Sequence, residues 1–335
     1  MDLERFPRIG FTHEPTPLEP LARLGPALGG PRLWVKRDDC TGLATGGNKT
    51  RKLDYLMAEA QAQDADLILT QGAVQSNHAR QTAAAAAKLG LDCHLLLEER
   101  LQAPPTVYRR SGNVFLDELF GSSWETRPGG TDMAAALAAT ADGFTAQGRR
   151  VYAIPGGGSN PCGALGYVRA TTELLAQADR MGVRVDRIVL ASGSAGTHAG
   201  VLAGLAALGR DIPVDGVSVR FPRDVQIERV HALAEATAAE LGAAGVPRAA
   251  VRVDDGHVGE GYGVPTAGMV DAVRRTARLE GLLLDPVYSG KAMAGLFAMV
   301  ARGDIDPAET VVFLHTGGAV SLFAYDWAFE GEAGR

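Results

Sequence analysis

The chain has 335 residues, of which 46% are apolar and 21% charged, as is typical of a soluble globular protein with one large domain or two interleaved ones. Its formal net charge of −6, without any basic cluster, argues against nucleic-acid binding, which needs a concentrated positive surface. No stretch approaches the roughly 18 apolar residues of a membrane span, and the first residues lack the apolar core of a secretory signal.

The predicted secondary structure alternates between short apolar runs and longer helical patterns. In chain order, the predicted elements are strands 33–36 and 67–70, helix 79–89, strand 93–97, helices 114–120 and 133–145, strand 151–154, helix 163–181, strand 187–191, helix 197–208, strand 214–219, helices 225–241, 269–284 and 291–301, and strand 311–314. This alternation predicts parallel sheets covered by helices on both faces. Ligands of such sheets bind at the carboxyl ends of the strands, so functional residues are expected in the loops that follow them.

The cysteines are Cys40, Cys93 and Cys162, an odd and sparse set without metal-ligand spacing. Such a set favours a reducing compartment and no disulfide framework. We therefore expect a cytoplasmic protein whose thiols are incidental and which holds no metal.

The first unusual loop is 45–53, TGGNKTRKL, at the entrance to a predicted helix. Its two glycines permit a sharp turn and close approach to a ligand. A partly desolvated Lys49 there would have a lowered pKa and act as a nucleophile towards a carbonyl group. The alternative is a solvated basic helix start that includes Arg51 and Lys52. The spacing is not that of a nucleotide-binding P-loop.

The second loop is 192–200, SGSAGTHAG, which follows a predicted strand and opens a helix. Free backbone N–H groups and the positive end of the helix favour binding of a phosphate there. Ser194 and Thr197 can add hydrogen bonds, whereas His198 is expected to pack in the helix. The alternative is a tight turn of small residues. A dinucleotide site is disfavoured because Asp211, the nearest acidic residue at the required distance, lies in a predicted loop.

Other candidates lie in five further loops. Ser76 and Asn77, in QSNH, can relay a proton or hydrogen-bond an oxygen, or can simply cap a helix. Tyr262 and Tyr288 lie in glycine-flanked loops and offer phenols for acid–base chemistry, although turn tyrosines that pack on the core are the alternative. Thr316, in HTGG at a strand end, can hydrogen-bond a ligand nitrogen. Residues 155–160, PGGGSN, are expected to be a hinge between two lobes or another loop of close approach.

Taken in order, the motifs GGNKTRKL, QSNH, IPGGGSN, SGSAGTHAG, GEGYGVP, LLLDPVYSGK and FLHTGG resemble one family. It comprises D-cysteine desulfhydrases, L-cysteate sulfo-lyases and 1-aminocyclopropane-1-carboxylate (ACC) deaminases, a branch of the fold-type II pyridoxal 5′-phosphate (PLP) enzymes. The resemblance runs from about Arg5 to Tyr325. It implies an α/β fold of two open parallel α/β lobes, tryptophan-synthase-β-like, with PLP in the cleft and usually a homodimer. The large PLP-binding lobe would comprise 1–50 and 156–335, and the small lobe 51–155.

The resemblance also implies roles for individual residues. Lys49 matches the lysine that binds PLP covalently and later moves the substrate's α-proton. Asn77 matches the residue bonded to the cofactor's phenolic oxygen, and Thr316 the hydroxyl that faces the pyridine nitrogen. The implied catalytic residues are Lys49, Ser76, Tyr262 and Tyr288. The implied phosphate cradle is Gly193, Ser194, Ala195, Gly196 and Thr197.

Two departures from the ACC deaminase pattern favour a cysteine-type substrate. ACC deaminases typically carry Glu after the DPVY tyrosine and Leu in the final H-x-G-G, whereas this chain has Ser289 and Thr316. Residues 36–47 and 217–220 look more like those of L-cysteate sulfo-lyases than of D-cysteine desulfhydrases. Arg220 would suit the fixed charge of a sulfonate, unless it is a surface residue at a strand end. Ser289 and Arg220 are therefore the candidate substrate contacts.

The expected reaction is β-elimination from a small amino acid. The sequence favours L-cysteate, which would give pyruvate, ammonia and sulfite. The alternatives are D-cysteine with release of sulfide, ACC deamination, and a non-catalytic phosphate- or nucleotide-binding protein. We expect no nucleic-acid or membrane partner.

Overall fold

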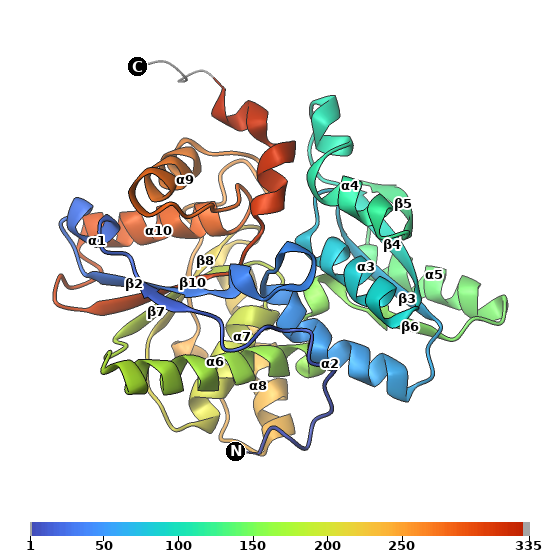
Figure 1. Ribbon diagram of the computed structural model, residues 1–335, viewed down its shortest axis with the longest axis horizontal. Coiled ribbons are helices and arrows are strands. Elements are labelled where there is room, and N and C mark those ends of the chain that lie inside the picture. Colours follow the sequence, from blue (N-terminus) through green and yellow to red (C-terminus); the bar gives the residue numbers. More distant parts are fainter. Residues whose placement is uncertain (1, 331–335) are drawn as a thin grey trace.

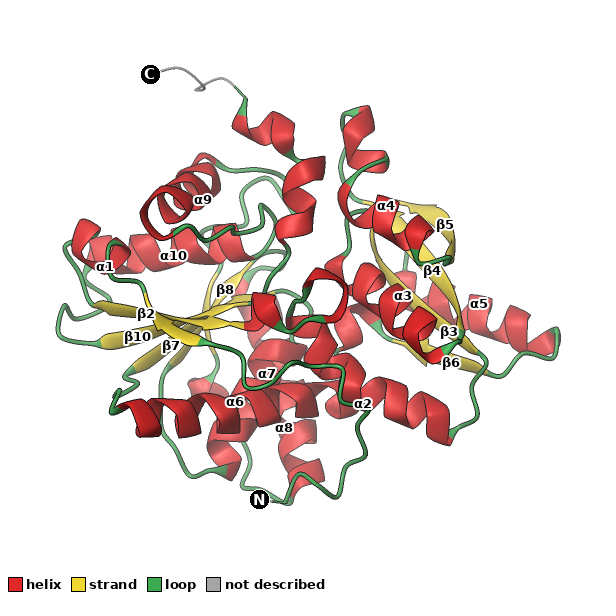
Figure 2. Cartoon of the chain, viewed as in Figure 1, coloured by secondary structure: helices red, strands yellow, loops and turns green. Residues whose placement is uncertain are grey.

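The computed structural model describes residues 2–330 and contains two separate β-sheets, each covered by helices (Figures 1 and 2). The larger sheet is parallel except for β1, and its strands in spatial order are β1 (Leu18–Pro20), β2 (Arg32–Arg37), β10 (Thr310–His315), β7 (Arg187–Ser192), β8 (Val214–Ser218) and β9 (Arg252–Asp254). The smaller sheet is entirely parallel, in the order β5 (Ser123–Pro128), β4 (Asp92–Glu99), β3 (Leu67–Ala73) and β6 (Val151–Ile154).

Helices cover both faces of both sheets. On the larger sheet one face carries α6 (Pro161–Met181), α7 (Gly196–Ala207) and α8 (Arg223–Leu241), and the other carries α1 (Leu24–Ala27), α9 (Ala267–Glu280) and α10 (Ser289–Arg302). On the smaller sheet α3 (Asn77–Leu89) and α4 (Gly112–Leu119) lie opposite α5 (Met133–Ala146). Helix α2 (Asn48–Ala62) packs on both α6 and α3, so it joins the two lobes.

The alternation of side chains along the strands explains why helices cover both faces. In β7, Ile188 and Leu190 pack into the apolar cluster of α6, α7 and α8, whereas Val189 and Ala191 pack against α9 and α10. Successive side chains of a strand point to opposite faces, so a continuous apolar run needs cover on both. The predicted fold class, two parallel α/β lobes, is confirmed.

The predicted lobe division agrees with the strands but cuts one helix. All four strands of the smaller sheet come from residues 67–154, while the larger sheet takes strands from both sides of that segment. A boundary at residue 51 falls inside α2, whose first turns contact both lobes. The division into 1–50 plus 156–335 and 51–155 remains a prediction.

The sequence missed three short strands and extended one helix too far. Strands β1 and β9 have three residues each, and β5, with the sequence SWETRP, carries no buried apolar run. Helix α9 was expected to reach Leu284 but ends at Glu280, because Gly281 takes a left-handed conformation (φ 68°) that closes the helix. None of the helices in residues 2–330 is both long and apolar enough to cross a bilayer.

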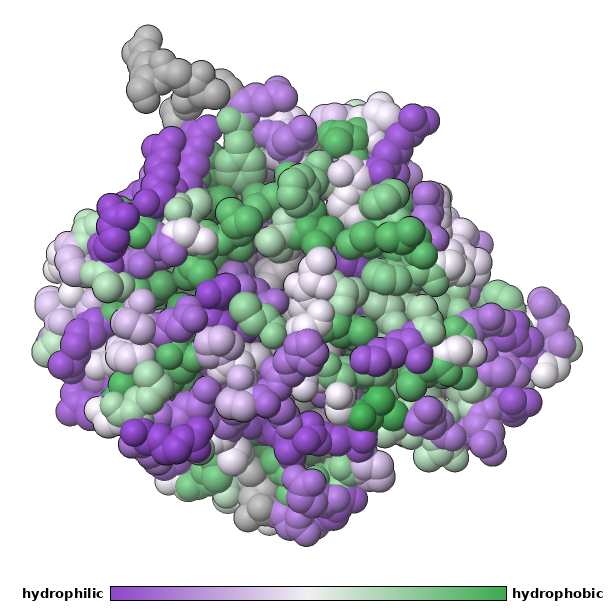
Figure 3. Space-filling model, viewed as in Figure 1, coloured by the Kyte–Doolittle hydropathy of each residue, from purple (hydrophilic) through white to green (hydrophobic). Residues whose placement is uncertain are grey.

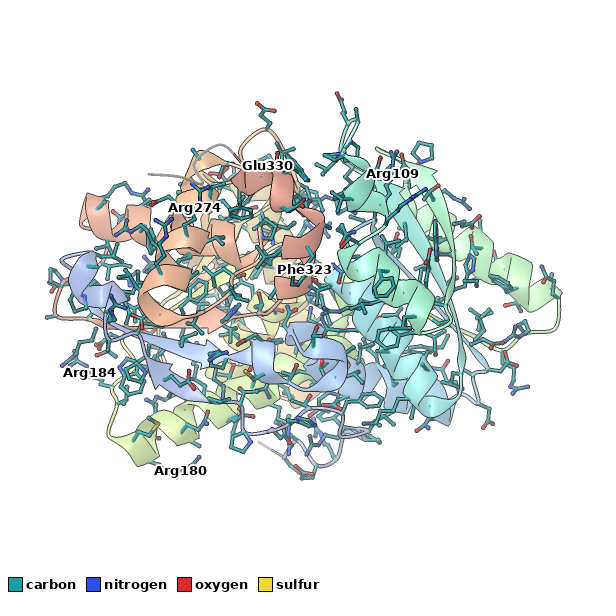
Figure 4. All side chains as sticks on the ribbon, turned by 45° about the horizontal axis from the view of Figure 1, so that its top comes forward. Arg109, Arg180, Arg184, Arg274, Phe323 and Glu330 are labelled. Atoms are coloured by element: carbon teal, nitrogen blue, oxygen red, sulfur yellow. The ribbon has the colours of Figure 1, made fainter. Side chains whose placement is uncertain are left out.

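An apolar patch is exposed where the two lobes meet. It comprises Phe115 and Leu119 of α4 and Phe323, which follows β10, and they are 53%, 66% and 70% exposed. Apolar side chains gather in the upper middle of the face drawn in Figure 3, and Figure 4 places Phe323 beside the lobe boundary. Exposed apolar surface of this kind is common at sites of protein association.

A buried ion network ties α2 to the large lobe. Arg51 donates two hydrogen bonds to Asp38, at 2.8 and 2.9 Å, and two to Glu173, both at 3.0 Å. Asp38 also accepts from Tyr167 (2.7 Å) and Thr16 (2.8 Å). Burial alone would raise the pKa of Asp38, but the Arg51 guanidinium outweighs it and holds that pKa below its ordinary value.

Replacing Asp38 by Ala should therefore lower the free energy of unfolding by about 3–5 kcal/mol, because Arg51 is left buried without the carboxylate that accepts two of its hydrogen bonds. Urea denaturation at neutral pH measures this loss. Asp92→Ala removes a carboxylate that also pairs with an arginine but is largely exposed, and it should cost no more than about 1 kcal/mol.

The free energy of unfolding that Asp38 contributes decreases when the pH is lowered. Because the folded-state pKa of Asp38 is depressed, its contribution is present above the unfolded pKa of about 3.9 and is lost as pH falls through the folded-state pKa. Equal losses of unfolding free energy in Asp38→Ala and Asp92→Ala, measured by urea denaturation, would contradict a structural role for the buried network.

Candidate active site

Loops from the carboxyl ends of strands in both sheets converge on a cavity between the lobes. They are 45–49, ahead of α2, 74–78 after β3, 155–160 after β6, 192–197 after β7 and 315–318 after β10. The inner part of the cavity is lined by Asn48, Lys49, Asn77, His78, Ala191, Ser192, Gly193, Ser194, Ala195, Thr197, His198, Tyr288, Thr316 and Gly317. The position agrees with the rule that ligands of parallel sheets bind beyond the strand ends.

The start of α2 sends five consecutive buried polar side chains in different directions. Asn48 donates to the Thr197 hydroxyl (2.9 Å), and Thr50 donates to Gln81 of α3 (3.0 Å). Arg51 enters the ion network, and Lys52 donates to the Gly157 carbonyl (3.0 Å). These contacts fix the helix in every direction around Lys49. The alternative of a solvated basic helix start is wrong, because residues 48–52 are all buried.

Lys49 points into the cavity with few partners. Its ammonium group donates to Asn48 Oδ1 (3.1 Å) and lies 6.0 Å from the centre of the Tyr288 ring. Burial lowers the pKa of Lys49 from 10.5 to about 8, although the Asp285 carboxylate opposes the shift. A lysine in this state is deprotonated often enough near neutral pH to attack a carbonyl carbon.

Lys52, which no sequence motif marked as a catalytic or binding residue, lies beside the loop at the start of α7. It is fully buried, and burial together with the nearby Lys49 charge lowers its pKa well below the ordinary value. A Cβ on Gly196 would lie 2.7 Å from its Nζ, so the amine lies beside the first residue of α7. The spacing of three residues from Lys49 on one helix was the signal that could have found it.

The loop 193–197 has a backbone geometry that would suit the predicted phosphate site. Ala195 has a φ of 78°, and α7 begins at Gly196, so free backbone N–H groups gather at the positive end of a helix. The Ser159 hydroxyl donates to Ser194 (2.8 Å) and accepts from the Gly196 N–H (3.2 Å). Residues 155–160 thus approach the cradle closely as well as connecting the lobes.

Asn77, Ser76 and Thr316 surround the same cavity. Asn77 Oδ1 is buried without a hydrogen-bond partner in residues 2–330, which suits an atom awaiting a ligand donor. The Ser76 hydroxyl caps α3 by accepting from the Ala79 N–H (3.1 Å). It also lines the second part of the cavity, the substrate-side cavity, together with Arg100, Arg220 and Tyr262. The Asn48 N–H donates to the Thr316 carbonyl (3.0 Å), which brings Thr316 next to Lys49.

Two tyrosines from separate loops come together at the cavity that Lys49 lines. The hydroxyls of Tyr262 and Tyr288 lie 2.5 Å apart, and burial raises the pKa of Tyr288 well above its ordinary value. Lys291 holds the first of these loops by donating to the carbonyls of Val258 (2.6 Å) and Gly261 (3.1 Å). The turn that carries Tyr288 is held by Asp285, which accepts from the Tyr288 N–H (3.0 Å).

The two candidate substrate contacts, Arg220 and Ser289, lie in different surroundings. Arg220 lies at the mouth of the substrate-side cavity, together with Arg100 and Tyr262. It makes no salt bridge with any carboxylate in residues 2–330, and its guanidinium stacks on Phe221, 4.7 Å from the ring centre. Ser289 is fully buried, and its hydroxyl donates to Asp285 (2.7 Å) at the start of α10. Ser289 is not among the residues that line the cavity, and its hydroxyl is used within the turn, so its predicted contact with the substrate remains a prediction.

Three functional candidates were missed besides Lys52. Asp285 and Lys291 belong to the DPVYSGK motif, but only the folded chain shows that they hold the tyrosine loops. Arg100 follows β4 in a segment without a distinctive sequence pattern. Conversely, His198 packs as expected, with its ring bonded to Ser192 (3.1 Å).

The titration of Lys49 is testable in the cofactor-free protein. Labelling with an amine-specific reagent, quantified by mass spectrometry across pH, should reach half its maximal rate near pH 8, because burial disfavours the ammonium form. The exposed Lys88 serves as an internal standard for the reagent. A midpoint near the ordinary value of 10.5 would show that the cavity is not desolvated as described.

The arrangement fits PLP on three observations. Two buried lysines face the cradle without a carboxylate of residues 2–330 bonded to either, the cradle presents backbone N–H groups, and Asn77 Oδ1 lacks a partner within the same residues. A phosphate would offset the lysine charges, and Lys49 would bond the cofactor's aldehyde carbon. The contacts predicted for individual residues remain predictions.

Comparisons with known proteins agree with this interpretation of the site. A profile of the family "Pyridoxal-phosphate dependent enzyme" matches residues 9–317. A D-cysteine desulfhydrase of Salmonella typhimurium is 46% identical over 323 residues, which are 96% of this chain and 97% of that protein. The crystal structure of an ACC deaminase homologue superimposes with a TM-score of 0.89 at 36% identity, covering 98% of this chain and 96% of the other. The crystal structure of an O-ureido-L-serine synthase, with a TM-score of 0.67 and 19% identity over 97% of this chain and 96% of the other, shares the fold.

The buried lysine, the phosphate cradle and the two-lobed fold therefore have one explanation. The chain belongs to the family of pyridoxal-phosphate dependent enzymes, in the fold-type II branch that includes D-cysteine desulfhydrases.

Proposed function

We propose that this PLP-dependent enzyme is a carbon–sulfur lyase that eliminates sulfite from L-cysteate and forms pyruvate and ammonia. The observation that carries this choice is Arg220, an arginine without a carboxylate partner in residues 2–330 at the mouth of the cavity that holds Lys49 and the tyrosine pair. L-cysteate carries a sulfonate besides its carboxylate, and a guanidinium binds such an oxyanion strongly.

A second candidate is elimination of sulfide from D-cysteine. It is favoured by the relative named D-cysteine desulfhydrase, which is 46% identical over almost the whole chain. The thiol of cysteine lacks the fixed charge of a sulfonate, so this reaction would leave Arg220 without a role in substrate binding. The two candidates share the cofactor, Lys49 and the elimination step.

In the proposed elimination, PLP and Lys49 have separate roles. Bound PLP supplies an electron-withdrawing ring that stabilises negative charge on the substrate's α-carbon. The amine of Lys49, whose pKa is about 8, takes the α-proton. The electron pair of the C–H bond becomes the Cα–Cβ double bond, and the sulfur leaves with the electrons of the Cβ–S bond. The released enamine is hydrolysed by water to pyruvate and ammonia.

The other side chains hold the substrate and the cofactor. Tyr262 and Tyr288 place a hydroxyl pair beside Lys49, where they can orient the substrate or hold a proton. Lys52 and the loop 193–197 would hold the phosphate, Asn77 the phenolic oxygen and Thr316 the ring nitrogen. The cytoplasmic location and the homodimer expected from the sequence stay predictions, the latter supported by the exposed patch of Phe115, Leu119 and Phe323.

The test is a parallel assay of the purified enzyme with L-cysteate and D-cysteine, following pyruvate, sulfite and sulfide. We expect sulfite and pyruvate from L-cysteate, and the loss of both in Lys49→Ala because the amine that takes the α-proton is gone. Sulfide from D-cysteine with no reaction of L-cysteate would establish the second candidate. Pyruvate from neither substrate would rule out both.

The cradle predicts a separate effect on cofactor affinity. In Gly196→Ala the new methyl group would lie 2.7 Å from both Lys52 Nζ and Ser159 Oγ, so it should displace groups that hold the phosphate. The dissociation constant for PLP, measured by absorbance titration, should rise roughly tenfold or more, the equivalent of one charge-assisted hydrogen bond. Gly143→Ala, on the exposed helix α5 with nothing within 4 Å, is the matched control and should leave the affinity unchanged.

A further inference from the structure

Arg220 is not the only arginine at the substrate side of the cavity. Arg100 follows β4 of the small lobe, and Arg220 follows β8 of the large lobe, yet both line the same cavity. Together with Tyr262 they also line a second, outer cavity. The two guanidiniums therefore stand at the passage between solvent and Lys49, one from each lobe.

Arg100 is held in a defined position. Its Nε donates to Glu98 (2.5 Å), whose other oxygen accepts from the Gly130 N–H (3.0 Å). The guanidinium carbon lies 4.5 Å from the centre of the Tyr262 ring, which belongs to the large lobe. Because the Tyr262 hydroxyl meets that of Tyr288, Arg100 is connected through two rings to the neighbourhood of Lys49.

At this passage Arg100 has a carboxylate partner, Glu98, whereas Arg220 has none in residues 2–330. Lys49, Arg100, Arg220 and Arg229 line the substrate-side cavity, and Asp132 is the one carboxylate among its lining residues, where it already accepts two backbone N–H groups at the start of α5. Glu98 pairs with Arg100 and, like Glu99 and Glu260, lines the outer cavity. Partial desolvation lowers the pKa of Arg220, and the Arg100 guanidinium lowers it further by repulsion, while the Glu98 carboxylate opposes the shift. An anion bound between them would relieve that repulsion.

We propose that Arg100 of the small lobe and Arg220 of the large lobe form a clamp, which binds an oxyanion group carried on the substrate's β-carbon. The enzyme therefore also eliminates sulfate from serine O-sulfate. This rests on the proposed lyase function. The substrate class is then set by the charge and shape of the leaving group, which is an oxyanion bonded through sulfur in cysteate and through oxygen in serine O-sulfate.

The additional reaction balances without an oxidant or a reductant. Lys49 takes the α-proton, and the C–H electron pair becomes the Cα–Cβ double bond. The Cβ–O bond breaks, and the oxygen keeps its electron pair and leaves as sulfate. Water then hydrolyses the released enamine to pyruvate and ammonia, as with cysteate.

The experiment compares an anionic with an uncharged leaving group in the holoenzyme. Serine O-sulfate and β-chloroalanine are supplied in both enantiomeric forms, and kcat and KM for pyruvate formation are measured for the enantiomer that reacts. Arg100→Gln and Arg220→Gln should each lower kcat/KM for serine O-sulfate about tenfold or more, with KM rising, because a charge-assisted contact is lost. The same variants should lower kcat/KM for β-chloroalanine by a much smaller factor, because its β-carbon carries no oxyanion.

The matched control is Arg184→Gln. It makes the same change of charge at the edge of the large lobe away from the small one (Figure 4), and it should leave both substrates unaffected. Arg100→Lys keeps the charge and should retain more activity on serine O-sulfate than Arg100→Gln. Equal losses on both substrates, or no loss on either, would overturn the clamp.

A measurement on the unmodified enzyme guards against variants that fold poorly. Methanesulfonate, which carries the sulfonate, should inhibit elimination competitively, whereas its uncharged analogue dimethyl sulfone should not. Equal inhibition by both compounds would overturn the clamp. Failure of the clamp while L-cysteate still gives sulfite would leave the proposed function standing, whereas pyruvate from neither cysteate nor cysteine would remove the function itself.

Discussion

The structure depends on the burial of five consecutive polar side chains at the start of α2. Residues 48–52 lie between the two sheets, and all except Lys49 bond to a different part of the fold: Asn48 to α7, Thr50 to α3, Arg51 to the ion network and Lys52 to the loop 155–160. A buried polar group without a partner is costly, so this segment fits only when both lobes and the N-terminal segment are in place. The same contacts leave Lys49 buried, nearly unpaired and aimed at the cavity.

The cavity has two electrostatic environments. The inner end combines two desolvated lysines with backbone N–H groups, which suits a doubly charged phosphate held permanently. The outer end carries arginines near solvent, where a substrate anion can arrive and leave. This division explains how one cleft can hold a cofactor firmly and exchange a small charged substrate, because the buried cations are weakly hydrated and the exposed ones are not.

Particular residues show how far sequence patterns reach. Lys49 and the loop 193–197 were found because their chemistry is encoded locally, by glycines, a lysine and a strand-to-helix turn. Ser289 was chosen from a family difference, but its hydroxyl is used within the turn that Asp285 caps. Arg100 lies in no recognisable motif, and its proximity to Arg220 arises only because β4 and β8 end on opposite sides of one cleft.

The sequence by itself determined the alternating α/β architecture, since apolar strands and amphipathic helices are periodic patterns that neighbouring residues create. It also identified the family and predicted the cofactor lysine and the phosphate loop, because each of these depends on residues adjacent in the chain. Only the tertiary structure decided which charged groups lose their water and which face each other across the cleft. Burial of Lys52, the Arg51 network and the position of Arg100 and Arg220 at one cavity depend on packing between segments far apart in sequence, and no local pattern encodes such packing.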